Sequence, residues 1–183
     1  MRKDLGAKPI LYPQPVLIIA AYGNDGNADA MNAAWGGITD YKEITMSLSA
    51  SHKTVKNILE TKAFTVSMGE AKYVKECDYL GMVSGNKEPD KLKKAGFSVV
   101  KSDKVNAPII NELSLTLECE LIDYEDEIMR GKIVNVSVDE SILTDDHIDL
   151  SKLQPITFDA ANNAYVVLGN QVGNAFKDGL EIK

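Results

Sequence analysis

Asp29-Ala30-Met31-Asn32-Ala33-Ala34-Trp35-Gly36-Gly37 is the most informative stretch of this chain. It places small residues, one amide and the only tryptophan side by side. A flat aromatic ligand can lie against such a backbone while Asn32 and the main chain hydrogen-bond its edge. Taken alone, Trp35 is more often a core or interface aromatic than a ligand contact. Both interpretations stay open at this point.

A second stretch, Ser49-Ala50-Ser51-His52-Lys53-Thr54, follows after one expected strand. It gathers three hydroxyls, an imidazole and an ammonium where a strand passes into a helix. The free N–H groups and the positive dipole end of a helix start attract phosphate. The same hydroxyls can instead cap the helix, and His52 can be a solvated surface residue. Together, one stretch suited to a planar ring and a following one suited to a phosphate match the two ends of flavin mononucleotide (FMN).

Length and composition exclude several classes of protein. A chain of 183 residues can bury a sizeable core as one domain, and its net charge of −7 argues against nucleic acid as a partner. The sequence has neither a signal core nor an apolar run of about 18 residues, so we expect no membrane partner and a cytoplasmic location. Cys77 and Cys119 predict reduced, buried thiols. His52 and His147 lack metal-ligand spacing, so no metal site is expected.

The hydrophobic pattern predicts many strands and a few short helices. Strands are expected over 16–22, 30–38, 44–49, 63–68, 113–121, 132–138 and 164–168. Helices are expected over 53–61, 73–81 and 89–95, with a short turn or helix over 149–153. Ser51 is the expected N-cap of the first helix. This order favours a mostly β fold, a closed or split antiparallel barrel.

Several other residues have a structural interpretation. The methionines at 31, 46, 68 and 82 fit core packing, and Cys77 fits an inert thiol. Asp123-Tyr124-Glu125-Asp126-Glu127 predicts a charged hairpin end. It is either a solvated tip or a docking point for a basic electron-transfer partner.

These segments, in this order, resemble the flavin-reductase-like proteins of the FMN-binding split-barrel fold, especially the flavoredoxin branch. The Pro-Val strand, the Asn/Asp-Gly turn, Trp-Gly-Gly and Ser-His-Lys-Thr carry the resemblance. Four further segments agree with it: Cys77–Gly85, Asp90–Phe97, Ala107–Glu112 and Asn163–Gly169. The resemblance runs from about residue 15 to 173. It implies an antiparallel, Greek-key split β-barrel, homodimeric, with 1–183 as a single FMN-binding domain.

The resemblance also implies a set of cofactor contacts. FMN is expected to bind non-covalently at the dimer interface. Asn32, Ala33, Ala34 and Trp35 would lie along the ring and the ribityl chain. The phosphate would contact Ser49, Ala50, Ser51, His52, Lys53 and Thr54. Ser84, Gly85 and Lys91 would approach the flavin from a loop. Many relatives have Arg in place of His52, which puts the strength of the phosphate contact in doubt.

The implied function is an FMN-dependent oxidoreductase of flavoredoxin or flavin reductase type. The flavin carries the chemistry, so no catalytic side chain is expected. NAD(P)H or a reduced iron–sulfur protein such as ferredoxin would be the electron donor. Two alternatives stay open: a non-enzymatic FMN electron carrier between protein partners, and a flavin-free dimeric interaction module.

Overall fold

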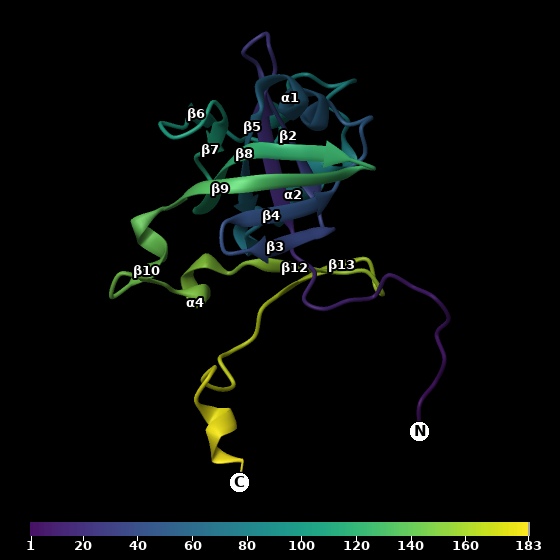
Figure 1. Cartoon of the computed structure of the whole chain (residues 1–183), viewed down its shortest axis with the longest axis vertical. Coiled ribbons are helices and arrows are strands. Elements are labelled where there is room, and N and C mark those ends of the chain that lie inside the picture. The colour runs from purple at the N-terminus through teal and green to yellow at the C-terminus, as the bar shows by residue number, and fades with distance from the viewer. Residues whose placement is uncertain (183) are drawn as a thin grey trace.

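Seven antiparallel strands form the main sheet of the computed structural model, which describes residues 1–182. They are β1 (Leu17–Tyr22), β2 (Ala28–Ala33), β3 (Gly36–Asp40), β4 (Glu43–Ser47), β5 (Ala63–Met68), β8 (Leu115–Glu125) and β9 (Ile128–Val138). Their order in the sheet is β2-β1-β5-β8-β9-β4-β3. Figure 1 shows the sheet curled into a half-barrel, which confirms the expected mostly β, antiparallel class.

The two edges of this sheet are joined by a very short connection. β2 and β3 are the edge strands, yet only Ala34 and Trp35 separate them along the chain. The expectation of one continuous strand over 30–38 is therefore wrong. The curl brings the far strands together: a Cβ on Gly36 would lie 3.1 Å from Leu17 Cδ1 of β1. Small residues at this corner allow that approach. The corner crosses the seam of the barrel, which is the line where the two edges of the sheet meet.

Short helices cover the ends and one side of the sheet. They are α1 (Lys53–Thr61), α2 (Val74–Met82), α3 (Lys91–Lys94) and α4 (Leu150–Leu153), with 3₁₀ turns η1 (Ala71–Tyr73), η2 (Glu140–Ile142) and η3 (Asp178–Glu181). Each lies within or close to a predicted helix, apart from the 3₁₀ turns η2 and η3. The predicted strands over 113–121 and 132–138 are longer than expected and meet at Asp126 and Glu127, both with positive φ.

Six short strands form three small antiparallel pairs outside the main sheet. They are β6 (Val99–Lys101) with β7 (Pro108–Ile110), β10 (Leu143–Thr144) with β11 (His147–Ile148), and β12 (Ile156–Asp159) with β13 (Ala164–Val167). Of these, β13 was expected as part of a strand over 164–168. The other five were not expected, since strands this short leave little pattern to recognise. The β12–β13 pair lies below β3 in Figure 1.

Strand β1 separates two hydrophobic clusters. Leu17 and Ile19 face the barrel interior, and Ile18 and Ala20 face the side covered by α2. This alternation is expected for a strand buried on both faces. The residues Ile44, Met46 and Leu48 of the predicted alternating strand are also buried in the barrel interior, together with Val55 and Ile58 of α1.

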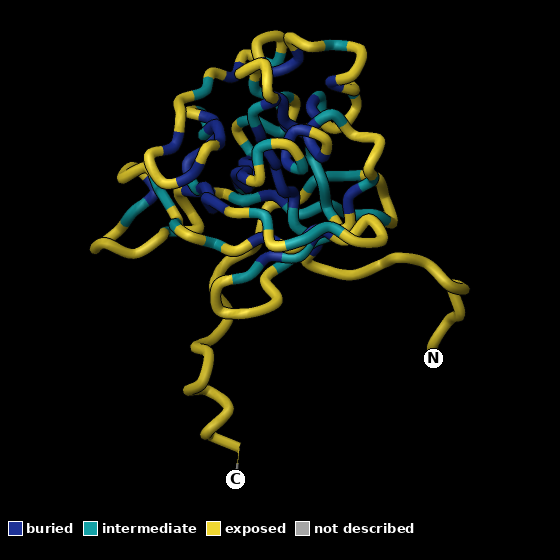
Figure 2. Tube along the Cα trace, turned by 45° about the horizontal axis from the view of Figure 1, so that its top comes forward, coloured by how far each residue is buried: buried dark blue, intermediate teal, exposed yellow. Residues whose placement is uncertain are grey.

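Two features differ from the core expected for the chain. Met82 is 78% exposed, so its assignment to the core is wrong. Met82 is the last residue of α2, and its side chain lies on the surface. Residues 1–13 and 169–182 are exposed throughout and extend away from the barrel as two arms (Figures 1 and 2).

Among residues 1–182 there is no helix of the length and apolarity needed to span a membrane. The single domain predicted over 1–183 stays a prediction, and Lys183 lies outside the described residues.

Candidate functional site

A cavity of about 150 Å³ lies between β2, the start of α1 and the end of α2. Seven of the thirteen predicted site residues line it: Asn32, His52, Lys53, Thr54, Ser84, Gly85 and Lys91. They come from four separate segments, so the fold has assembled them. Ser49, Ala50 and Ser51 precede the cavity-lining turn, and Ala33, Ala34 and Trp35 lie beyond the other end of the cavity lining.

Helix α1 begins at this cavity without a side-chain cap. His52, and not Ser51, is its N-cap residue, and the His52 side chain makes no capping hydrogen bond. The Ser49 and Ser51 hydroxyls lie 3.1 Å apart and bond each other. The expected capping role of Ser51 is therefore wrong. The N–H groups of the first turn stay available beside Lys53, which is the arrangement that binds an anion.

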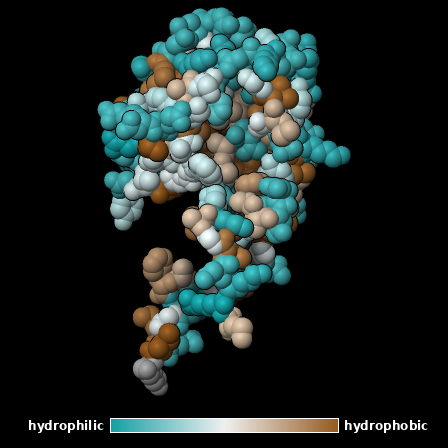
Figure 3. Space-filling model, turned by 90° about the vertical axis from the view of Figure 1, so that its right-hand side faces the viewer, coloured by the Kyte–Doolittle hydropathy of each residue, from teal (hydrophilic) through white to brown (hydrophobic). Residues whose placement is uncertain are grey.

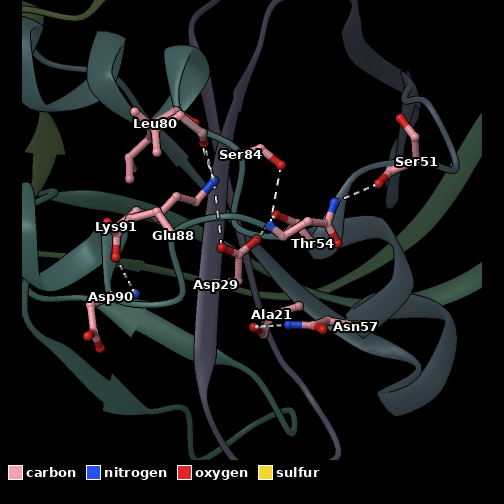
Figure 4. A network of polar contacts seen from close by, with 12 residues as sticks. Ala21, Asp29, Ser51, Thr54, Asn57, Leu80, Ser84, Glu88, Asp90 and Lys91 are labelled. Carbon is pink, nitrogen blue, oxygen red and sulfur yellow. Dashed lines mark hydrogen bonds and ion pairs between the residues drawn. The ribbon is translucent and has the colours of Figure 1, made fainter.

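A buried carboxylate lies beneath the cavity. The Asp29 Oδ2 atom accepts a hydrogen bond from the Thr54 hydroxyl at 2.5 Å, and its Oδ1 atom is 3.6 Å from the Lys91 ammonium. Lys91 also donates to the carbonyls of Val83 (3.1 Å) and Leu80 (3.4 Å) (Figure 4). Burial lowers the pKa of Lys91, and the Asp29 carboxylate opposes that shift. Lys91 thus neutralises Asp29 and fixes the end of α2.

The loop that follows α2 is fixed against the same carboxylate. Gly85 is buried so closely that a Cβ there would lie 2.1 Å from Asp29 Oδ1. Asn86 donates its side-chain amide to the carbonyl of Ser51 at 2.9 Å and its backbone N–H to the Ser84 hydroxyl at 3.3 Å. These contacts hold the loop over the start of α1, as Figure 4 shows for Asp29, Ser84 and Ser51.

The opposite side of the cavity is closed by helix α2. Asn32 donates its side-chain amide to the carbonyl of Cys77 at 3.1 Å. A Cβ on Gly81 would lie 3.2 Å from the Asn32 Cβ, so a small residue allows the helix to approach β2. The Tyr165 hydroxyl donates to Asp78 at 2.7 Å. Burial, and then the Asp78 carboxylate, raise the pKa of Tyr165 to about 12.

Trp35 lies at the corner between β2 and β3 and is 58% exposed. The core interpretation of Trp35 is therefore wrong, and its ring is accessible to a ligand or to another chain. Ala33 and Ala34 beside it are only partly buried. The chain from Asn32 to Trp35 thus leads from the cavity to an open surface at the seam of the barrel.

The charged hairpin end lies beside the candidate site. Tyr124 donates its hydroxyl to the carbonyl of Leu48 at 2.7 Å, and Glu127 accepts from the N–H of Ala50 at 3.2 Å. Asp126 is exposed at the tip. A negative surface therefore adjoins the segment expected to contact phosphate.

The expected site omitted two polar residues that organise the cavity, Asp29 and Asn86. Asp29 is the only charged residue in the first stretch. A charge directly before an expected strand of small and apolar residues is a signal that could have indicated a buried pair. Nothing local distinguishes Asn86, because its role depends on the approach of Ser51 from another segment.

The comparisons with known proteins agree with this geometry. Residues 10–154 match the model of the flavin reductase like domain. The chain therefore belongs to the flavin reductase-like family. Solved flavin reductase-like split barrels share its fold at low sequence identity.

Two solved flavoredoxins are similar along nearly the whole chain. The flavoredoxin of Desulfovibrio vulgaris (Miyazaki F) is 35% identical with a TM-score of 0.94, covering 98% of this chain and 100% of that one. The flavoredoxin of Methanosarcina acetivorans is 27% identical with a TM-score of 0.87, covering 98% of each chain. A curated protein of Aeropyrum pernix is 30% identical over 117 residues, which are 62% of this chain and 44% of that protein. This chain thus spans less than half of that relative.

Proposed function

We propose that this protein binds FMN non-covalently and acts as an oxidoreductase of flavoredoxin type. The observation that carries the proposal is the cavity at the uncapped start of α1, with Lys53 beside it and the accessible Asn32–Trp35 segment leading away from it. An anion subsite next to a flat, open backbone fits a phosphate joined to a planar ring.

Each part of the site has a role in this proposal. The first-turn N–H groups of α1, with His52 and Lys53, hold the phosphate. The segment from Asn32 to Trp35 lies along the ring and the ribityl chain. Thr54 does not donate to the phosphate, because its hydroxyl proton bonds Asp29. When bound, FMN supplies hydride and single-electron transfer chemistry.

The proposed partners are a second copy of the chain and an electron donor. The ring would lie at the interface of a homodimer, where the exposed Trp35 is available to both copies. NAD(P)H or a reduced ferredoxin-like protein would supply the electrons. The 35% identity to a flavoredoxin over nearly the whole chain supports this assignment.

The test is the visible absorption spectrum of the purified protein, followed by release and identification of any chromophore. Flavin bands and released FMN support the proposal, whereas released FAD would replace FMN in it. A colourless protein that takes up no added FMN would refute it and leave a flavin-free interaction module. Anaerobic titration with NADH, NADPH and reduced ferredoxin then identifies the donor from the bleaching of the flavin bands.

The second candidate is a non-enzymatic FMN carrier between proteins. The acidic hairpin end next to the site favours it, because exposed Asp126 offers a docking surface to a basic partner. Reduction by a basic redox protein, with no oxidation of NADH or NADPH, would select the carrier. Such a reduction should slow as salt is added, because the attraction between opposite charges is screened.

A further inference from the structure

The C-terminal arm, residues 169–182, leaves its apolar side chains bare. Val172 and Phe176 are each 102% exposed, Leu180 is 81% exposed and Ile182 is 85% exposed. Figure 3 shows brown, hydrophobic side chains on the segment at the bottom, which stands apart from the barrel. In a single copy of the chain these four side chains are therefore almost fully exposed.

The polar groups of the arm are, in contrast, paired with one another. Asn174 donates its N–H to Asp178 at 2.7 Å, and Gln171 donates to the side chain of Asn174 at 3.1 Å. The 3₁₀ turn η3 follows directly. The arm therefore has a defined local structure with polar contacts inside it and apolar side chains outside it.

A large groove lies where the arm leaves the barrel. It measures about 940 Å³ and runs between residues 144–154 and residues 167–173. Ile148, Leu150, Val167 and Leu168 line it and are 44–55% exposed. The groove is thus a partly apolar surface of the size that takes up several side chains.

We propose that the arm of one copy lies in this groove of a second copy, and that the exchange is reciprocal. This inference rests on the homodimer of the proposed function and names the segment that holds it together. Arm and groove adjoin on one side of each chain, so a two-fold axis places each arm against the other groove. The superposition with the flavoredoxin of D. vulgaris covers 98% of the chain and so includes most of the arm, which indicates a shared arm conformation.

The area involved is that of a stable dimer. Burying one large apolar side chain removes roughly 60–120 Å² of apolar surface from water. Two arms with four such side chains each bury roughly 500–1,000 Å², and the covered groove surfaces about double that figure. The resulting total of roughly 1,000–2,000 Å² overlaps the roughly 1,200–2,000 Å² that specific interfaces bury.

The first test compares charged substitutions by sedimentation velocity over a range of concentrations. Phe176→Asp with Leu180→Asp should raise the dimer dissociation constant at least about 100-fold. Tyr41→Asp is the matched control, because Tyr41 is 101% exposed on the turn between β3 and β4 and belongs neither to the arm nor to the groove lining. A wild-type monomer would overturn the proposal. So would a double variant that dimerises like wild type, or dissociation caused by Tyr41→Asp alone.

The second test locates the arm. Ile148→Cys and Phe176→Cys variants are purified separately, mixed and treated with a flexible bismaleimide. The native thiols, Cys77 and Cys119, are buried. We expect a link between positions 148 and 176 of two different chains. A link formed only within one chain of the Ile148→Cys/Phe176→Cys double variant would show that the arm folds back on its own groove, and would overturn the exchange.

The flavin spectrum of the same samples separates this inference from the proposed function. A colourless but arm-exchanged dimer contradicts only FMN binding. A yellow protein that dimerises without its arms contradicts only the exchange.

Discussion

The Thr54 hydroxyl donates a 2.5 Å hydrogen bond to Asp29, and both side chains are buried. This bond ties the first turn of α1 to strand β2 directly beneath the candidate site. It also takes the only hydroxyl proton of Thr54. The Thr54 hydroxyl therefore fixes the first turn of α1 and has no further proton to donate.

Replacing Thr54 with valine keeps the shape of the side chain and removes its donor. We expect the free energy of unfolding in urea to fall by about 1–3 kcal/mol, because the buried Asp29 loses its hydrogen bond. Thr54→Ser retains the hydroxyl and should remain nearer to wild type. Equal stability of the valine variant and wild type would show that the Asp29 carboxylate does not depend on this bond.

Gly85→Ala should displace the loop over α1. Its new Cβ would lie 2.1 Å from a buried carboxylate oxygen, which cannot move without breaking its contacts with Thr54 and Lys91. We expect FMN affinity to fall by about tenfold or more, since misplacing site residues weakens binding. Gly169→Ala is the control, because a Cβ there meets nothing within 4 Å. Equal FMN affinity of both variants in fluorescence titrations would contradict the fixed loop.

Lys53→Gln should weaken recognition of the FMN phosphate and leave recognition of the ring unchanged. We expect FMN affinity to fall by about 1–2 kcal/mol, because a partly exposed cation beside the anion subsite is lost. Riboflavin, which has no phosphate, should bind the variant as it binds wild type. Lys42→Gln is an exposed control away from the cavity. An equal loss for FMN and riboflavin would place Lys53 at the ring and not at the phosphate.

The two cysteines should stay unreactive until the chain unfolds. Burial raises the pKa of Cys77 and of Cys119 from 9.0 to about 12. At pH 8 a disulfide reagent should modify neither thiol in the folded protein and both after denaturation. Rapid modification of the folded protein would show that the thiols are accessible.

The same shifts predict how stability depends on alkaline pH. A raised pKa means that the folded chain keeps its thiol protons while the unfolded chain loses them. Stability should therefore fall as pH rises from about 9 to about 12, by about 1.4 kcal/mol per pH unit for each thiol. Replacing Cys119 with alanine should make this slope shallower in urea titrations. An unchanged slope would assign the alkaline loss to other groups.

The local elements of the fold could be predicted from the sequence because their patterns are local. The α1 helix begins and ends as predicted at Lys53 and Thr61, and Val55 and Ile58 form its buried stripe. The alternation at Ile44, Met46 and Leu48 likewise identified the interior face of β4 and the residue after it.

The corner between β2 and β3 could not be predicted in the same way. Residues 30–38 look like one strand, because their pattern does not reveal that Ala34 and Trp35 connect opposite edges of a sheet. The contacts that decide this, such as Gly36 against Leu17 of β1, join distant parts of the chain. The same reason hides the roles of Asp29 and Asn86, whose partners come from α1 and its entry.

The sequence predicted part of which residues lie together at the candidate site, but not the contacts that they make with one another. His52, Lys53 and Thr54 do line one cavity with Asn32. The sequence could not show that the Thr54 proton and the Lys91 ammonium are engaged with Asp29. Hydroxyls and ammonium groups serve ligands and buried partners equally well, so only the fold distinguishes these uses.

Because of the corner at Ala34 and Trp35, a ligand can bind this site only after the barrel has folded completely. The five other strands of the sheet lie between the two strands it joins, so the placement of these two edges relative to each other is complete only when the whole sheet has paired. A partly folded chain therefore has the residues of the site but not their arrangement. Because a ligand stabilises only the state that binds it, added flavin should slow unfolding without speeding the early steps of refolding. In this chain the cofactor would select the finished barrel and would not guide its assembly.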